Sequence, residues 1–516
     1  MVNYKEILAN RLSEAVKLCC PDAERILFKE SDGGFFCDYD IPPLVPSVFS
    51  EIGKNVVVTD LDCAFELHSY SGVYEDGSAK NRILQRIYVI VFPTAHELEN
   101  YKNFIAEALK YDHKTLGNEL KLFSSSNEIG QGLILWHPKG AMIRYLLESF
   151  GQKAHILNGY QWVYTPHIGR AELWKTSGHL DFYKDAMYSP IVIDDEEYYL
   201  KPMNCPFHIN IYNGEIHSYR ELPVKYAEYG SVYRYELSGA LNGLTRVRGF
   251  TQDDAHIFCT PEQIEKEVTD ALKFSLYILR SFGLEKFQPY VSTKPKYKAI
   301  GDDKDWERAT EVLKKAVLSA GLEYKVDEGG GAFYGPKIDL KLFDSLNREW
   351  QCSTIQFDFN LPTRFHMFYV GSDGQRHTPY MVHRALFGSL ERFMALLTEH
   401  YKGDFPFWLA PVQFGVVPIR ECHNDYAIQL SGRLKEQGFR VDLNNGSDNM
   451  RNKIKRFQLD KTPYMLIVGD REIENNTFAV RSRKDGDLGA MDIPALVNYL
   501  KPQIEQGTPK YIMESE

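Results

Sequence analysis

The central part of the chain, from about residue 120 to 405, contains strand-like segments that follow one another without regular alternation with helices. Apolar and β-branched patterns predict strands over residues 160–168, 196–204, 225–237, 245–259 and 333–359. Two amphipathic helix patterns, 140–150 and 261–283, interrupt the series. Neighbouring parallel strands require a crossover connection, usually a helix. The pattern therefore favours an antiparallel sheet with helices packed on one side.

The two ends of the chain have different patterns. From about residue 406 strands and helices alternate, which predicts an α/β domain of about 100 residues. Residues 1–85 are mixed α/β, and a helical pattern over 94–120 follows, with Thr94 as its expected N-cap. We therefore expect a multidomain α+β and α/β protein with domains 1–85, 86–405 and 406–516.

Composition excludes several classes of protein. The eight cysteines form no CxxC pair and no dense framework, which is typical of a reducing compartment. The N-terminus has charges throughout and lacks the apolar segment of a signal peptide, and no run of about 18 apolar residues occurs. We expect a cytoplasmic protein with no membrane partner. The net charge of −10 gives no support to a generally basic nucleic-acid-binding surface, although a local basic face is compatible with it.

The densest group of polar residues in a strand context lies at 232–258. Arg234 and Glu236 are two residues apart, so on a strand they point to the same face. They either form a simple cross-sheet ion pair, or bind a ligand through the planar guanidinium fork and the carboxylate. The segment 237–244 between the strands, LSGALNGL, contains two glycines and is suited to closing over a ligand.

A second polar group lies in the segment HRALFGSLERF, residues 383–393. Gly388 permits close backbone approach, and Arg392 falls in the first turns of an expected helix. Arg392 is either a surface arginine or, with the helix N-terminus, part of a phosphate site. Similarly Cys205, in KPMNCPFH, is by composition a buried packing residue, a reactive thiol or a metal ligand.

These segments resemble motifs 2 and 3 of the class II aminoacyl-tRNA synthetases, and residues 140–168 resemble motif 1. Many further segments are similar to the threonyl-tRNA synthetase family, including LWKTSGHLDFYKDAMY, KPMNCP, RVRGFTQDDAHIFC, FYGPKIDLKL, QCSTIQFDFNLPTRF, HRALFGSLERF and PYMLIVGDREIE. The resemblance covers about residues 60 to 505, and its motifs occur in the family's order.

The resemblance implies a zinc ion, one per subunit, held by Cys205, His256 and His383. Three protein ligands leave zinc an open position, which the amino and hydroxyl groups of threonine can fill. Valine has a methyl group in place of the hydroxyl and is rejected, because a site that uses a hydroxyl strongly discriminates against an analogue lacking it. Serine keeps the hydroxyl and is expected to be rejected only weakly.

The resemblance also implies an ATP site on the antiparallel sheet, with Mg2+ bridging the phosphates. The ATP-binding residues it implies are Arg234 at the α-phosphate, Arg246 and Arg392 at the outer phosphates, Glu236 and Phe250 at the adenine, and also Gln351 and Thr354. The threonine-binding residues are Gln252, Asp254 and Tyr334. The catalytic residues are Arg234, Lys337 and Arg392.

The implied activity is ligation of L-threonine to tRNA(Thr) through a threonyl-adenylate, by positioning and charge neutralisation. The C-terminal domain resembles the family's anticodon-binding domain. Glu474, Arg481 and Arg483 are then candidates for contacts to anticodon bases, although a basic face such as NMRNKIKR is also typical of a solvated surface. The motif 1 resemblance implies a homodimer.

The chain departs from the family pattern in two places. Editing domains of the family carry an HxxxH pair, and His68 is the only histidine before residue 96. We expect residues 1–85 to be a shortened module without editing activity against Ser-tRNA; the alternative is an unrelated supporting domain. The second departure is Phe207, where the family usually has a small residue, which predicts either a reshaped pocket or packing behind it.

Two other functions compete with threonine ligation. One is a class II synthetase of another specificity, such as proline or serine, which the complete Cys/His/His set argues against. The other is a catalytically silent tRNA-binding or regulatory paralogue. Retention of Arg234, Glu236 and Arg392 argues against it.

Overall fold

The computed structural model describes residues 4–31, 33–57, 63–75, 82–296 and 299–512 of the chain. Contacts divide the chain into two compact units, Met1–Lys110 and Tyr111–Glu516. The short elements of the second unit that are not discussed further are β5 (Phe123–Ser125), β6 (Ile134–Trp136), α6 (Ala171–Ser177), α7 (His179–Phe182), β11 (His217–Ser218), α11 (Leu361–Arg364), β18 (Tyr369–Val370) and β19 (Arg376–His377).

The first unit is an antiparallel sheet covered by helices. The strand order is β1 (Glu24–Ser31), β2 (Gly34–Asp40), β4 (Ile83–Phe92) and β3 (Ala64–Tyr74). Helices α1 (Tyr4–Cys19) and α2 (Pro46–Asn55) pack on each other, and their apolar faces join the strands in one core that includes Leu8, Phe35 and Ile87. The side chains of β2 and β4 that point toward the helices thus form part of this core, on one face of the sheet.

The helical pattern expected over 94–120 forms two helices, α3 (Ala95–Lys110) and α4 (His113–Glu119). Thr94 begins the first as predicted: its Oγ1 accepts from the N–H of Glu97, and the Glu97 carboxylate accepts from the N–H of Thr94. Asp112 caps the second, because its carboxylate accepts from the N–H of Lys114 at 2.8 Å. A side-chain cap in the middle of an apolar pattern thus starts a new helix.

The second unit is built on an eight-stranded sheet. Its order is β15 (Lys325–Asp327), β14 (Phe287–Ser292), β16 (Lys337–Phe343), β17 (Glu349–Asp358), β20 (Tyr380–Ser389), β13 (Gly249–Cys259), β12 (Val224–Tyr233) and β7 (Gln161–Trp162). The six inner strands pair antiparallel, and only the two edge strands pair parallel. The predicted antiparallel sheet is confirmed.

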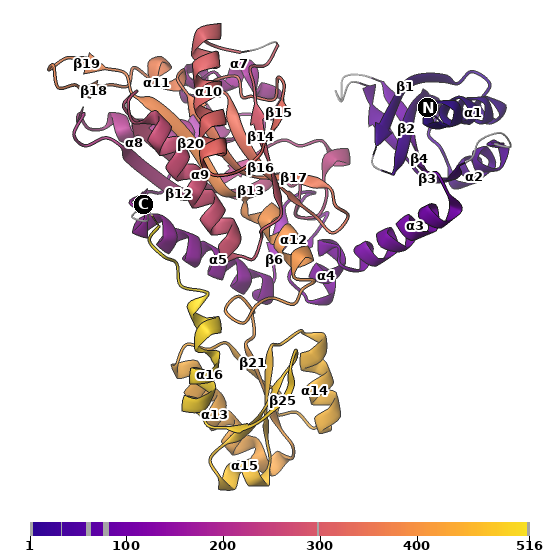
Figure 1. The fold of residues 1–516 in the computed structure, drawn as a ribbon, viewed down its shortest axis with the longest axis vertical. Coiled ribbons are helices and arrows are strands. Elements are labelled where there is room, and N and C mark those ends of the chain that lie inside the picture. The colour runs from indigo at the N-terminus through magenta and orange to yellow at the C-terminus, as the bar shows by residue number, and fades with distance from the viewer. Residues whose placement is uncertain (1–3, 32, 58–62, 76–81, 297–298, 513–516) are drawn as a thin grey trace. The chain divides into compact units, whose positions relative to one another are not determined.

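Helices cover one face of this sheet. Helix α9 (Ile264–Ser281) packs on β13, β17 and β20, and α10 (Asp303–Ser319) packs beside it on β14 and β16 (Figure 1). Helices α5 (Pro138–Leu157) and α12 (Leu390–His400) contribute to the same core, which includes Ile257, Leu272 and Leu386. The alternating outward positions of β13 and β20 are therefore left to line a site on the other face.

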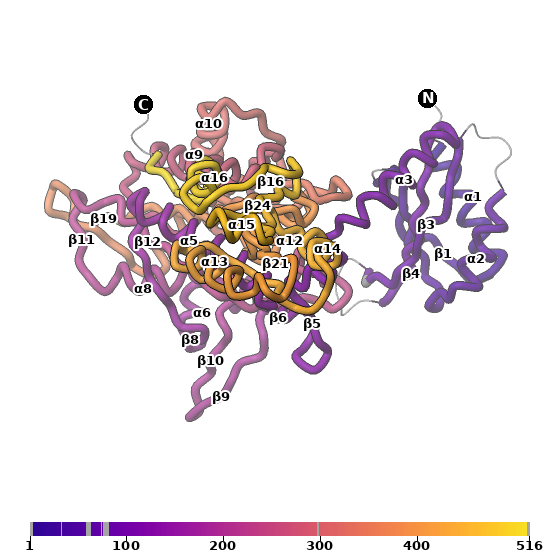
Figure 2. Tube along the Cα trace, turned by 90° about the horizontal axis from the view of Figure 1, so that it is seen from below, coloured from indigo at the N-terminus to yellow at the C-terminus, as the bar shows by residue number. Residues whose placement is uncertain are grey.

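The strand expected over 160–168 is only partly formed. β7 ends at Trp162, and β8 (Ile168–Arg170) pairs in a different sheet with β10 (Glu196–Leu200), which also pairs with β9 (Ile191–Ile193). Pro166, which has no N–H to donate to a strand partner, lies in the gap. Figure 2 shows the β9–β10 hairpin projecting from the body of the second unit.

The C-terminal part of the second unit is the predicted α/β domain. Its sheet has the order β22 (Val441–Leu443), β21 (Phe414–Pro418), β23 (Tyr464–Val468), β24 (Phe478–Ser482) and β25 (Gly486–Met491). The accompanying helices are α13 (Asn424–Glu436), α14 (Met450–Leu459), α15 (Asp470–Glu474) and α16 (Ile493–Glu505).

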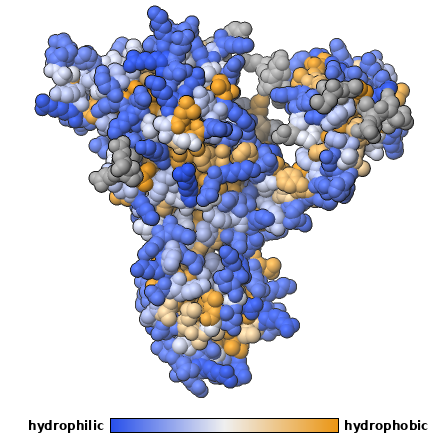
Figure 3. Space-filling model, viewed as in Figure 1, coloured by the Kyte–Doolittle hydropathy of each residue, from blue (hydrophilic) through white to orange (hydrophobic). Residues whose placement is uncertain are grey.

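Hydrophilic side chains dominate the face in Figure 3. Among the described residues, no helix is both long and apolar enough to cross a bilayer.

Candidate active site

A cavity of about 800 Å3 opens on the sheet face formed by β13, β17 and β20. Side chains that are far apart in the sequence meet there because the strands are neighbours in the sheet. The candidate residues that line the cavity are Cys205, Arg234, Glu236, Arg246, Phe250, Gln252, Asp254, His256, Tyr334, Gln351, Thr354, His383 and Arg392. Of the candidates in this domain, Lys337 is not among the lining residues, and its Nζ pairs with Asp339 at 2.7 Å.

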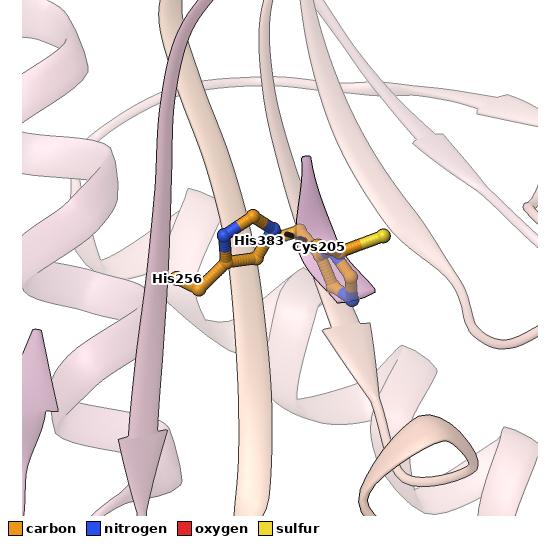
Figure 4. Close-up of side chains that lie close together, drawn as sticks. All are labelled: Cys205, His256 and His383. Atoms are coloured by element: carbon orange, nitrogen blue, oxygen red, sulfur yellow. Dashed lines mark hydrogen bonds between the residues drawn. The ribbon is translucent and has the colours of Figure 1, made fainter. Parts of the chain in front are cut away.

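Cys205, His256 and His383 converge in the cavity. His256 and His383 are direct partners in the β13–β20 register, and Cys205 is the first residue of α8 (Cys205–Asn213). Their ligand atoms all lie within 4.8 Å of one another, and all three side chains are buried (Figure 4). The His256 Nε2 and His383 Nδ1 atoms are 3.0 Å apart.

This donor set fits zinc. One sulfur and two imidazole nitrogens are ligands that zinc prefers, and bonds of about 2.0–2.1 Å at tetrahedral angles place two nitrogens about 3.3 Å apart. Burial, followed by the neighbouring His208 and His383, lowers the pKa of His256 well below its ordinary value. The imidazole is therefore neutral, which is the form that binds a metal.

Two buried side chains that sequence reasoning did not single out hold these histidines. His383 donates from Nε2 to Asp358 Oδ2 at 2.8 Å, and the Nδ1 atoms of His256 and His208 are 2.7 Å apart. A carboxylate behind a ligand histidine fixes the orientation and tautomer of its ring. Asp358 follows Thr354 and Gln356 at intervals of two residues on β17. The strand period is therefore the signal that could have placed it on the cavity face.

Three arginines bring positive charge to the same cavity. Arg392 donates to the carbonyls of Thr245 and Gln351, both at 2.8 Å, and burial, with Arg246 and Arg234 nearby, lowers its pKa. In the described part of the chain neither Arg234 nor Arg392 has a carboxylate within salt-bridge distance, and Arg246 lies 4.0 Å from Glu236. Such a group of guanidinium ions matches a polyphosphate.

The remaining candidates are held by short hydrogen bonds. Gln351 and Thr354 both donate to Asp339 Oδ1, at 2.7 Å, while Lys337 pairs with the other oxygen of that carboxylate. The Tyr334 ring stacks on His383 with a centroid distance of 4.9 Å. Lys337 therefore reaches the cavity wall through Asp339.

Asp254, Phe250 and Gly388 complete the wall. Asp254 accepts from Asn204 at 3.0 Å, and burial raises the pKa of its carboxyl. The Phe250 ring lies 5.1 Å from the Arg234 guanidinium carbon. Gly388 has φ +73, and a Cβ there would lie 2.4 Å from the carbonyl of Cys352, so the predicted close backbone approach is confirmed.

Phe207 packs behind the pocket. It lies two positions after Cys205 on α8, and two helical positions differ by about 200°, so the two side chains point to opposite sides. The ring contacts Trp174, with a centroid distance of 5.8 Å, and joins a small cluster with Tyr199. Phe207 is absent from the cavity lining, which favours the second of its two predicted roles.

The anticodon candidates lie in the C-terminal domain. Glu474 ends α15, and Arg481 is an exposed residue of β24. Arg483 forms a salt bridge with Asp404, and burial lowers the pKa of its guanidinium. Glu474 and Arg481 are therefore open to a partner, whereas Arg483 already binds a carboxylate.

Comparison with known families agrees with this geometry. Residues 188–401 match the family described as tRNA synthetase class II core domain (G, H, P, S and T), and residues 413–503 match the family described as Anticodon binding domain. With its antiparallel sheet, flanking helices and C-terminal α/β domain, the chain has the architecture of a class II aminoacyl-tRNA synthetase.

Individual relatives narrow the class. The threonine--tRNA ligase of Sulfurihydrogenibium sp. (strain YO3AOP1) is 49% identical over 97% of this chain and 75% of the relative, and that of Aquifex aeolicus (strain VF5) is 51% identical over 88% and 71%. The RNA binding domain of threonyl-tRNA synthetase from Cryptosporidium parvum Iowa II has a TM-score of 0.73 and 40% identity, covering 76% of this chain and 98% of that one. The chain belongs to the threonine--tRNA ligase family.

Proposed function

We propose that the chain joins L-threonine to tRNA(Thr) through a threonyl-adenylate, with the amino acid recognised at a zinc site formed by Cys205, His256 and His383. The observation that carries the proposal is the presence, in one cavity, of a buried Cys/His/His set and three converging arginines. The first fits a metal that binds an amine and a hydroxyl, and the second fits the phosphates of ATP.

In the first step a threonine carboxylate oxygen bonds to the α-phosphorus of ATP, and the bond to the β-phosphate breaks to release pyrophosphate. Arg234 orients the carboxylate and the α-phosphate, while Arg246 and Arg392 neutralise the outer phosphates. Glu236 accepts from the adenine amine and Phe250 stacks on the base. Catalysis is thus positioning and charge neutralisation, and Mg2+ accompanies the ATP.

Cys205, His256 and His383 would hold a zinc ion, which would leave coordination positions for the amino and hydroxyl groups of threonine. Asp254, Gln252 and Tyr334 line the same cavity and are proposed to contact the amino acid. Lys337 is proposed to act through Asp339, which fixes Gln351 and Thr354 in the wall.

In the second step the terminal ribose hydroxyl of tRNA bonds to the acyl carbon and AMP leaves. The domain around residues 406–516 is proposed to read the anticodon, with Glu474, Arg481 and Arg483 as candidate contacts. Arg483 must first exchange its salt bridge with Asp404, so we expect Arg481 to contribute more. Single-stranded loop bases are read by such hydrogen bonds, and the affinity should fall with salt.

We further propose that the chain acts as a homodimer. Large apolar side chains are exposed on the segments that resemble motif 1 and on the projecting hairpin: Tyr145 is 61% exposed, Tyr164 78% and Val192 65%. Burial of such a group against a second copy is favourable. Sedimentation of the intact chain tests this, and a monomer at micromolar concentration contradicts it.

The experiment that tests the function is amino-acid-dependent ATP–pyrophosphate exchange with threonine, serine, valine and proline. Threonine should support exchange, serine weakly, and valine and proline not at all. If none of the four amino acids supports exchange, the proposed ligase activity is wrong. If proline is preferred, the proposed specificity for threonine is wrong. For the metal, Cys205→Ala should lose bound zinc; unchanged zinc content refutes the ligand set.

A further inference from the structure

His113 is a buried histidine outside the cavity, and it joins two separate segments of the second unit. It is the first residue of α4, and its side chain has no exposed surface. Its Nδ1 lies 2.7 Å from Oε1 of Glu399 near the end of α12, and its Nε2 lies 3.1 Å from the backbone nitrogen of Leu244. Leu244 belongs to the loop between β12 and β13.

These contacts define one tautomer. The Glu399 carboxylate can only accept, so Nδ1 carries the hydrogen, and Nε2 is then free to accept the N–H of Leu244. The carboxylate is itself fixed by two backbone donors, the N–H of His113 at 3.0 Å and that of Ser345 at 2.7 Å. Asp112, His113 and Glu399 are close enough to hold a metal, but the two ring nitrogens of His113 already have partners. The group is therefore a hydrogen-bonded support.

The supported loop carries residues of the cavity wall. Leu244 is followed by Thr245, whose carbonyl accepts from Arg392 Nε at 2.8 Å, and then by Arg246. Backbone hydrogen bonds from Thr245 and Arg246 to the Asn242 carbonyl close the segment 242–246 into a tight turn. The N–H group that His113 accepts belongs to Leu244. It is therefore one residue before the carbonyl that accepts from Arg392 and two residues before Arg246.

Gly243 provides an independent observation of the same contact. Its φ is +50, and a Cβ built on it would lie 2.2 Å from His113 Nε2 and 2.8 Å from Lys114 Cγ. The Lys114 amine also donates to the Asn242 side chain at 3.1 Å. The turn 242–246 therefore packs directly on the start of α4, and only glycine leaves room for it.

We propose that His113 is a positioning residue for ATP: by accepting the N–H of Leu244 it holds the turn 242–246 so that Arg246 and Arg392 face the phosphates. The inference rests on the proposed function, which places the ATP phosphates at these arginines. His113 contacts no reacting atom. Its effect is expected on ATP binding and not on threonine binding, because the turn that it holds contacts Arg392 and contains Arg246, and its own hydrogen-bond partners are Glu399 and Leu244.

The first experiment compares His113→Phe and His113→Gln in threonine-dependent ATP–pyrophosphate exchange. Phenylalanine keeps the ring but removes the acceptor, and glutamine retains a donor for Glu399 and an acceptor for Leu244. His113→Phe should raise the KM for ATP about tenfold, the usual effect of losing a buried hydrogen bond, and change the KM for threonine less than about twofold. His113→Gln should recover most of the ATP affinity.

His423 offers a matched control. It is buried in the C-terminal domain, its Nδ1 accepts the N–H of Arg420, and its Nε2 lies 2.9 Å from the Asp470 carboxylate. His423→Phe removes the same two kinds of hydrogen bond far from the cavity, so it should lower the melting temperature without changing the KM for ATP. An equal rise in both KM values for His113→Phe, or an ATP effect shared with His423→Phe, overturns the proposal.

A double-mutant cycle tests the contact itself. Gly243→Ala and His113→Ala should each raise the KM for ATP. The KM for ATP of the double variant should be no more than about twofold above that of either single variant, because the two substitutions break the same contact. If the double variant instead raises the KM for ATP by the product of the two single effects, the two residues act independently and the proposal is wrong.

Arg246→Ala distinguishes failure of the proposed ATP site from failure of the positioning role of His113. If it leaves the KM for ATP unchanged, the proposed ATP site is wrong. If it raises that KM while the His113 variants do not, only the positioning role is wrong.

Discussion

Replacing Asp358 by asparagine should weaken zinc binding although Asp358 touches no metal. The carboxylate is fully buried at the end of β17. Its Oδ2 accepts from His383 Nε2 at 2.8 Å, and its Oδ1 accepts from the backbone N–H groups of Asn360 and Leu361, at 2.8 and 2.9 Å. An asparagine that keeps the two backbone hydrogen bonds with its oxygen turns its amide group toward His383. Two donors then face each other, and His383 must move its hydrogen to Nδ1, the atom that faces His256.

The size of the effect follows from this conflict. A hydrogen bond to a charged group contributes about 1.5–3 kcal/mol, and loss of a supporting partner behind a metal ligand typically lowers metal affinity 10–100-fold, about 1.4–2.8 kcal/mol. The two ranges agree. We therefore expect the zinc dissociation constant of Asp358→Asn to rise at least tenfold, and threonine-dependent exchange to recover when zinc is added in excess.

The assay is competition for zinc between the protein and a chelator, with the melting temperature as a check on folding. Asp373→Asn is the matched control, because Asp373 pairs with exposed His377 at 3.0 Å outside the cavity lining. The control should bind zinc like the parent. A folded Asp358→Asn variant whose zinc affinity is within twofold of the parent refutes the tautomer argument.

Four further results are expected. Burial raises the pKa of Glu399, but the hydrogen bonds from His113 and from the backbone N–H of Ser345 together outweigh it and keep the pKa below its ordinary 4.5. The stabilising effect of the carboxylate is therefore present above that pH and lost as pH falls through the folded value, so the difference in unfolding free energy between the parent and Glu399→Gln should shrink below pH 4.5. Gly388→Ala should destabilise the chain by about 1–3 kcal/mol in urea unfolding, because its φ is +73 and the new Cβ meets a carbonyl. Phe207→Leu should leave the ratio of threonine to serine activation unchanged within twofold, and a large change would return the residue to the pocket. Added Ser-tRNA should persist in the presence of the chain, since no HxxxH pair precedes residue 96, and rapid deacylation would contradict this.

The sequence predicted the sheet and the cavity residues well because both depend on local pattern or on motifs. The run of strand patterns without helices between them predicted the antiparallel sheet, and the family resemblance joined Cys205, His256 and His383 across gaps that no local motif spans. The cavity also contains the arginines assigned to ATP. Phe207 shows the value of helical geometry: it lies two residues after Cys205 in the sequence, but its side chain points away from Cys205 in the helix.

The supporting residues escaped prediction for a physical reason. His113 and Glu399 are 286 positions apart, and His383 and Asp358 are 25 apart on separate strands. Nothing in the local sequence of a histidine tells which buried carboxylate will orient it. The division of the 94–120 pattern into two helices was also hidden, because Asp112 acts as a cap only when the chain turns there.

One structural relation connects the Cys/His/His set of the cavity with the helix that carries Arg392. In the β13–β20 pairing His256 lies opposite His383, and four residues earlier on β13 Gln252 lies opposite Ser389, the N-cap of the helix that carries Arg392. The pairing shifts by an irregularity between Gln252 and Asp254. Because side chains alternate between faces, a slip of one residue would turn His256 away from His383 and change the position of both relative to Ser389 and the helix that follows it. The carboxylate of Asp253, which accepts from the N–H groups of Leu386 and Phe387 at 2.8 and 3.0 Å, fills this irregularity. The irregularity thus sets the spacing along β13 between His256 and the start of the Arg392 helix, and the buried carboxylate of Asp253 holds the register at that point.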